Sequence, residues 1–118
     1  ASDRKDRKIY YFDKWILNVK RRQLISNEES EVKLTAGEFN LLTAFLDMPR
    51  QVLSREQLLS ASRVHDEEIF DRSIDVLILR LRRKLETDAS APKLIRTERG
   101  AGYIFDADVV VEARRRAK

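Results

Sequence analysis

Residues 71–85 read DRSIDVLILRLRRKL, and this stretch decides the fold that the sequence predicts. At about 100° per residue, its apolar side chains share one narrow sector of a helix: Ile74, Leu77, Ile78, Leu81 and Leu85. Three arginines lie on or beside the opposite sector, namely Arg72, Arg80 and Arg83. Such a helix buries one side and presents guanidinium groups to an anion on the other. The pattern therefore predicts a recognition helix for nucleic acid.

The charge and composition of the chain limit the kinds of protein to which it can belong. The 118 residues fit one domain, carry a net charge of +4 and include no cysteine, which excludes disulfides and thiolate metal sites. The segment from Arg72 to Lys84 holds five cations and one carboxylate, so its own charge is also +4. No apolar run approaches the ~18 residues of a membrane helix, and the charged first residues do not form a signal peptide. Because the chain begins at Ala1, we expect a cut inside a longer protein, with residues 1–8 as the end of a linker.

Short apolar runs predict antiparallel strands before residue 35. They centre on Trp15 and Leu17, on Leu24–Ile25 and on residues 32–34.

Two capping boxes predict the starts of two helices. In the first, the side chains of Thr35 and Glu38 can each bond the other residue's backbone amide, and apolar residues continue the helix as far as Pro49. In the second, Ser54 and Gln57 have the same spacing and open a shorter helix.

Gly100 and Gly102 mark a hairpin near the C-terminus. Residues 93–97 and 102–105 are predicted to be strands joined by a tight turn, since glycine reaches positive φ without steric cost. Strands, three helices and a hairpin together predict an α+β fold, a winged helix-turn-helix over residues 9–106. Residues 107–118 are predicted to be a basic tail that adds non-specific attraction for DNA.

Four strings in this order resemble the OmpR/PhoB family, the effector domains of bacterial two-component response regulators. They are LTAGEFNLL (34–42), LSREQLL (53–59), DRSIDVLILRLRRKLE (71–86) and IRTERGAGYIF (95–105). They occur with the family's spacing, and the stretch 61–86 looks most like the VirG/TorR branch.

The resemblance implies a four-stranded N-terminal sheet on three helices, with the third helix in the major groove and the hairpin wing at the adjacent minor groove. It also implies a receiver domain phosphorylated by a sensor kinase, tandem dimers on direct-repeat duplex DNA, contact with RNA polymerase and a cytoplasmic location. No cofactor and no membrane partner is expected.

The recognition helix supplies most of the candidate DNA contacts. Arg80 is expected to read O6 and N7 of a guanine, with a phosphate contact as the alternative. Backbone phosphates are the expected partners of Arg72, Ser73, Arg82 and Arg83, with a merely solvated charged face as the alternative. Val76 and Leu79 point outward, where they either contact thymine methyl groups or pack against a loop.

Further candidate contacts lie outside that helix. Thr97 and Arg99 match family positions that contact DNA in the wing, and an arginine at a hairpin tip can enter a narrow minor groove. Tyr103 either donates to a phosphate or packs under the wing. Arg63 stands where many relatives have tryptophan, so it can keep a phosphate contact but loses a stacking surface.

The loop from Ser62 to Phe70 is too long for a simple turn between helices. The resemblance implies that RNA polymerase is engaged there. Its acidic residues Asp66, Glu67 and Glu68 could meet a basic polymerase surface, and a merely solvated loop is the alternative.

Neither catalysis nor a metal site is expected. His65 is the only histidine and lies among carboxylates without a committed nucleophile. The alternative to DNA binding is a winged-helix module that binds RNA or a protein partner. RNA-binding modules usually expose aromatic side chains for stacking, whereas Trp15, Phe39 and Phe45 lie in core-forming patterns here, which favours DNA.

Overall fold

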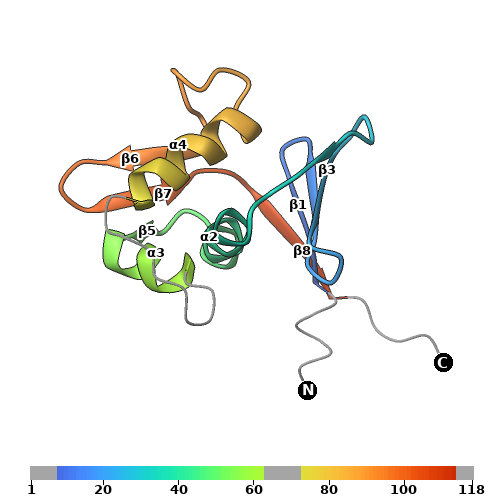
Figure 1. The fold of residues 1–118 in the computed structure, drawn as a ribbon, viewed down its shortest axis with the longest axis horizontal. Coiled ribbons are helices and arrows are strands. Elements are labelled where there is room, and N and C mark those ends of the chain that lie inside the picture. The colour runs from blue at the N-terminus through green and yellow to red at the C-terminus, as the bar shows by residue number, and fades with distance from the viewer. Residues whose placement is uncertain (1–7, 63–72, 114–118) are drawn as a thin grey trace. The chain divides into compact units, whose positions relative to one another are not determined.

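The computed structural model describes residues 8–62 and 73–113 (Figure 1). Within these residues the chain forms two compact units. One comprises the described residues up to Leu34 together with those from Asp108 onward, and the other spans Thr35–Ala107.

The first unit is an antiparallel sheet with the strand order β4-β3-β2-β1-β8. Its strands are β1 (Lys8–Phe12), β2 (Trp15–Asn18), β3 (Gln23–Ser26), β4 (Glu31–Val32) and β8 (Val109–Ala113). Tyr10, Leu17 and Leu24 are cross-strand partners in one row, and all three are buried. The neighbouring row contains Tyr11 and Ile16, which are more exposed. The alternation gives this sheet one strongly buried side.

The edge strand β8, which is the fifth strand of this sheet, lies beyond the predicted end of the domain. Residues 107–118 were expected to be a tail, yet Val109–Ala113 pair in register with Lys8–Phe12, so residue 8 also belongs to the sheet rather than to a linker. Three consecutive valines favour a strand. Their partner strand lies about a hundred residues earlier in the chain, so nothing close in the sequence marks the pairing. The implied four-stranded sheet therefore has five strands here.

The second unit combines helices with a small sheet. The helices are α2 (Ala36–Asp47), α3 (Arg55–Ser62) and α4 (Ser73–Leu85), and the strands are β5 (Val52–Leu53), β6 (Ile95–Glu98) and β7 (Gly102–Phe105). The sheet order is β5-β7-β6, so the β6–β7 hairpin is the predicted wing. Its tip projects beyond the helices (Figure 1). The predicted α+β winged helix-turn-helix is confirmed.

Both capping boxes are present. The Glu38 amide donates to Thr35 Oγ1 over 3.2 Å, and the Thr35 amide donates to Glu38 Oε1 over 3.0 Å. The Gln57 amide donates to Ser54 Oγ over 3.1 Å, and the Ser54 amide donates to Gln57 Oε1 over 2.8 Å. These bonds satisfy amides that the first turn of a helix leaves without partners, which explains why α2 and α3 begin where they do.

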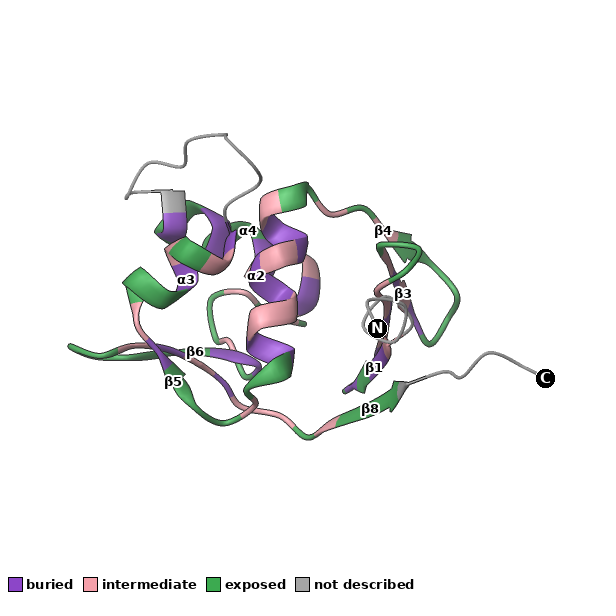
Figure 2. Cartoon of the chain, turned by 90° about the horizontal axis from the view of Figure 1, so that it is seen from below, coloured by how far each residue is buried: buried purple, intermediate pink, exposed green. Residues whose placement is uncertain are grey.

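The core of the second unit lies between the helices and the wing sheet. All five residues of the predicted apolar stripe of α4 are buried, with exposures between 0% and 7%. Buried residues also recur along α2 (Figure 2), where Phe45 faces Phe105 of β7 with ring centroids 6.0 Å apart. This packing places the outer side of α4 and the wing at the surface.

Candidate nucleic-acid interface

The outer side of α4 is exposed and combines arginines with apolar side chains. Arg80 and Arg83 are exposed, and so are Val76 (41%) and Leu79 (44%). Residues three and four apart are neighbours on a helix surface, so these four side chains form one continuous face. All four lie where the sequence predicted, and Val76 and Leu79 point outward rather than into the core.

Arg82 does not belong to this exposed face. Its Nε donates to the carbonyl oxygen of Ile95 over 2.9 Å, and its Nη2 donates to Thr97 Oγ1 over 2.9 Å. The guanidinium carbon also lies 5.7 Å from the centre of the Tyr103 ring, within the range of a cation–π contact. The side chain predicted to contact phosphate is therefore engaged with both strands of the wing.

Asp75 is a second polar residue of α4 that turns toward other elements. It accepts a hydrogen bond from the Tyr103 hydroxyl over 2.6 Å. Arg55, at the start of α3, donates Nη2 to both oxygens of the same carboxylate over 2.8 and 3.0 Å. Asp75 thus links the two helices of the helix-turn-helix to the wing.

The same contacts explain the pKa of Tyr103. Burial raises the pKa of the hydroxyl above its usual value, and the hydrogen bond to Asp75 raises it further, because both favour the neutral phenol. Tyr103 is 7% exposed and therefore packs under the wing, which was one of its two predicted roles.

The wing tip is exposed and tightly turned. Thr97, Glu98 and Arg99 are exposed, and the Ala101 amide donates to the Glu98 carbonyl over 3.0 Å to close the turn. Gly100 has a φ of +76°. The structure places Thr97 and Arg99 on an accessible hairpin, as the sequence predicted.

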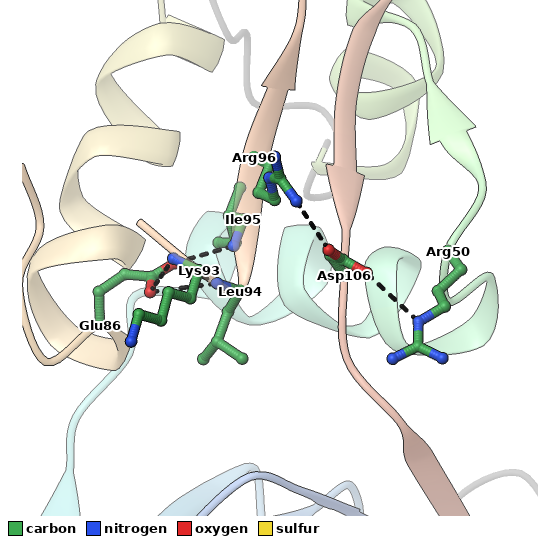
Figure 3. A network of polar contacts seen from close by, with 7 residues as sticks. All are labelled: Arg50, Glu86, Lys93, Leu94, Ile95, Arg96 and Asp106. Carbon is green, nitrogen blue, oxygen red and sulfur yellow. Dashed lines mark hydrogen bonds and ion pairs between the residues drawn. The ribbon is translucent and has the colours of Figure 1, made fainter. Parts of the chain in front are cut away.

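Two polar clusters hold the base of the wing (Figure 3). The carboxylate of Glu86, just after α4, accepts from the backbone amides of Lys93, Leu94 and Ile95 over 2.8–3.1 Å. Asp106 pairs with Arg96 over 3.0 Å and with Arg50 over 3.3 Å. The first cluster orders the entry into β6, and the second ties the exit of β7 to both β6 and the link after α2.

Glu38 and Lys84 connect α2 to the recognition helix. The Glu38 side chain is 1% exposed and pairs with Lys84 Nζ while also capping α2. A buried carboxylate needs such partners, because an unpaired charge in the interior is costly.

Several of the predicted contact residues are not among those that the structure describes. Arg63, Arg72 and the acidic residues Asp66, Glu67 and Glu68 lie outside the described residues. Ser73 is the first residue of α4.

Three residues that support this surface were not predicted from the sequence: Asp75, Arg55 and Glu86. One signal was available, because Asp75 and Arg82 are seven residues apart and therefore lie on one side of α4 beside the apolar stripe. For Arg55 and Glu86 the partners lie on other elements, and no local pattern marks them.

Within 8–62 and 73–113, no group of three or more His, Cys, Asp or Glu side chains is arranged to hold a metal ion. None of the helices described there is long and apolar enough to cross a membrane.

Known proteins resemble this chain in sequence and in fold. A family model described as "Transcriptional regulatory protein, C terminal" matches residues 28–105. The chain is 72% identical over 107 residues to the regulatory protein VirG of Agrobacterium fabrum, with 91% of this chain and 42% of VirG covered. It is 50% identical over 96 residues to the transcriptional regulatory protein AruR of Pseudomonas aeruginosa, with 81% and 39% covered. The chain therefore spans less than half the length of these relatives.

A solved structure also resembles the fold. It is the DNA-binding domain of RstA from Klebsiella pneumoniae in complex with the RstA box, at 33% identity and a TM-score of 0.71. The similarity covers 83% of this chain and 96% of that one.

Proposed function

Because this chain belongs to the family of C-terminal DNA-binding domains of transcriptional regulatory proteins, we propose that α4 docks in the major groove of duplex DNA and the β6–β7 wing at the adjacent minor groove. DNA binding and transcription regulation follow from the family. The docking geometry rests on the exposed basic and apolar side of α4, which is the observation that carries the proposal.

Each exposed side chain of α4 has a role in this proposal. Arg80 reads a guanine edge through two hydrogen bonds, and Val76 and Leu79 contact thymine methyl groups. Arg83 contacts backbone phosphate, together with Ser73, the first residue of α4, and with Arg63 and Arg72. Polar and apolar groups side by side on one helix suit a groove that offers both hydrogen-bonding edges and methyl groups.

The wing contributes through its exposed tip. Arg99 enters the minor groove, where a narrow A·T-rich segment attracts a guanidinium by its negative potential. The Thr97 hydroxyl accepts from Arg82 and keeps its own proton to donate to a phosphate oxygen.

Substitution of Arg80 tests the proposal. We expect Arg80→Ala to lower the ratio of specific to non-specific affinity by about 10- to 100-fold, because a two-bond guanine contact contributes ~1–3 kcal/mol of discrimination. The measurement is selection of bound duplexes from a randomised pool, followed by titration of the selected site and of an unrelated duplex.

Arg83→Ala is the matched control, because Arg83 is exposed on the same helix. It should weaken both duplexes about equally and reduce the slope of log affinity against log salt by about 0.9. An unchanged affinity ratio in Arg80→Ala would remove Arg80 from base reading. Failure of the parent chain to select any duplex would overturn the docking proposal and favour an RNA or protein partner.

The partners of the longer protein are a further part of the proposal. Family membership supports a receiver domain, a sensor kinase, tandem binding to direct repeats and a location in the bacterial cytoplasm, where the DNA is. We propose that Asp66, Glu67 and Glu68 engage RNA polymerase. Alanines at these three positions should leave DNA affinity unchanged and lower transcription from an activated promoter in vitro. Full transcription by that variant would leave the acidic residues merely solvated.

A further inference from the structure

The side of α4 that faces the wing carries the two polar residues Asp75 and Arg82. They are seven residues apart, about 20° short of two full turns, so they lie one above the other. The Tyr103 side chain meets both, since its hydroxyl donates to Asp75 over 2.6 Å and its ring lies 5.7 Å from the Arg82 guanidinium carbon. The wing is therefore held along two turns of α4.

Arg82 contacts both strands of the hairpin at the same level. Thr97 of β6 and Tyr103 of β7 are direct cross-strand partners. The guanidinium donates to Thr97 Oγ1 over 2.9 Å and lies over the ring of Tyr103, while its Nε donates to the Ile95 carbonyl over 2.9 Å. The planar fork of a guanidinium suits such a fixed set of contacts better than an ammonium group would.

We propose that Arg82 is a positioning residue that sets the wing against the recognition helix, rather than a phosphate contact. Arg99 lies two residues beyond Thr97, so a wing held at Thr97 and Tyr103 presents Arg99 at a defined distance from Arg80. This role rests on the proposed function, because it fixes how α4 and the wing, the two elements proposed to contact DNA, are placed relative to each other. Arg83, the next residue, points outward and serves as the matched control.

The first test needs no DNA and therefore does not depend on the proposed function. Amide hydrogen exchange of residues 97–103 is measured in the 118-residue chain and in Arg82→Ala, Arg82→Lys and Arg83→Ala. We expect about tenfold faster exchange in Arg82→Ala, a smaller increase in Arg82→Lys and none in Arg83→Ala. Thr97→Val removes the hydroxyl that accepts from Arg82 and should therefore also speed exchange. This variant replaces Arg82→Ala if Arg82→Ala fails to fold. Unchanged exchange in the folded variants would overturn the proposal.

The second test is a double-mutant cycle on the selected duplex. If Arg82 acts through the wing, Arg82→Ala should weaken binding about tenfold in the parent chain and less than about threefold in the Arg99→Ala background. In that background the salt slope should not change further. If the losses of DNA affinity are additive and Arg82→Ala reduces the slope of log affinity against log salt by about 0.9, Arg82 is a phosphate contact and the proposal is overturned.

Discussion

Tyr103 shows how one buried side chain joins several elements. Its ring packs under the wing, its hydroxyl donates to Asp75, and Asp75 in turn binds Arg55. The hydroxyl is neutral in this arrangement, because burial and the adjacent carboxylate both raise its pKa. The junction of α3, α4 and the wing therefore depends on the protonated form of one phenol.

This dependence predicts a loss of stability in alkali. A group whose pKa is raised in the folded state favours folding below its unfolded pKa, about 10 for tyrosine, and loses that contribution as the pH rises through the folded pKa. The free energy of unfolding should therefore fall more steeply above pH 10 in the parent chain than in Tyr103→Phe. At pH 8 the variant should be less stable by about 1 kcal/mol, the contribution of one hydrogen bond.

Urea denaturation between pH 8 and pH 11 measures the difference. The two proteins differ only at residue 103, so subtracting one curve from the other isolates the contribution of the Tyr103 hydroxyl. Parallel curves across this range would show that Tyr103 does not titrate with folding.

At the scale of elements, the wing is held by close backbone approach as well as by side chains. Gly102, at the start of β7, has a φ of +143°, and a Cβ added there would lie 2.0 Å from the Leu53 carbonyl oxygen of β5. Gly100, at the hairpin tip, has a φ of +76°, and a Cβ added there would meet nothing within 4 Å. Gly100 therefore allows the tight turn, whereas Gly102 allows β7 to approach the backbone of β5 closely.

The difference predicts unequal costs of substitution. Gly100→Ala should lower the free energy of unfolding by about 1 kcal/mol, the cost of a left-handed residue. Gly102→Ala should lower it by at least about 3 kcal/mol, because the methyl group must also displace β5. Chemical denaturation of both variants tests this, and equal losses would contradict the close approach of β5 to β7.

Different sides of helix α4 contact α2, α3 and the wing. Its apolar stripe fills the core, Lys84 pairs with Glu38 of α2, and Asp75 and Arg82 bind the wing and α3. Among the side chains of α4 that the structure describes, the outward face consists of Val76, Leu79, Arg80 and Arg83. Of the arginines predicted to contact DNA, Arg82 therefore supports the wing, whereas Arg80 and Arg83 are exposed.

At the scale of the whole molecule, the proposed docking uses one helix and one wing from each copy of the chain. A module that makes so few contacts binds weakly alone, and we therefore expect tight binding to need a second copy on a neighbouring half-site. If the two copies bind on one side of the duplex, as the proposed tandem arrangement requires, the half-sites should be about one helical turn apart.

This reasoning predicts a strict dependence on spacing. Two like-oriented half-sites with centres about 10 base pairs apart should bind the chain more tightly than the same half-sites about 15 base pairs apart, where the copies lie on opposite sides. Titration of the two duplexes at one salt concentration measures this, with a single half-site as the control. Equal affinity at both spacings would indicate independent binding.

Features carried by neighbouring residues could be predicted from the sequence alone. Both capping boxes, the buried stripe of α4 and the glycine turn depend on residues that are adjacent or a few positions apart, and the winged-helix order followed from them. The exposed positions Val76, Leu79 and Arg80 were also predicted, because they follow from the helical period once the buried stripe is known.

Features that join distant parts of the chain were decided by the tertiary structure. Arg82 binds Thr97 15 residues away, and Lys84 pairs with Glu38 46 residues away. Tyr11 donates to Glu112, which lies 101 residues away in the unpredicted strand β8. The helical period limits each side chain of α4 to a direction, but not to a partner. An arginine beside the stripe becomes a wing support or a DNA contact only when packing brings another element within its reach.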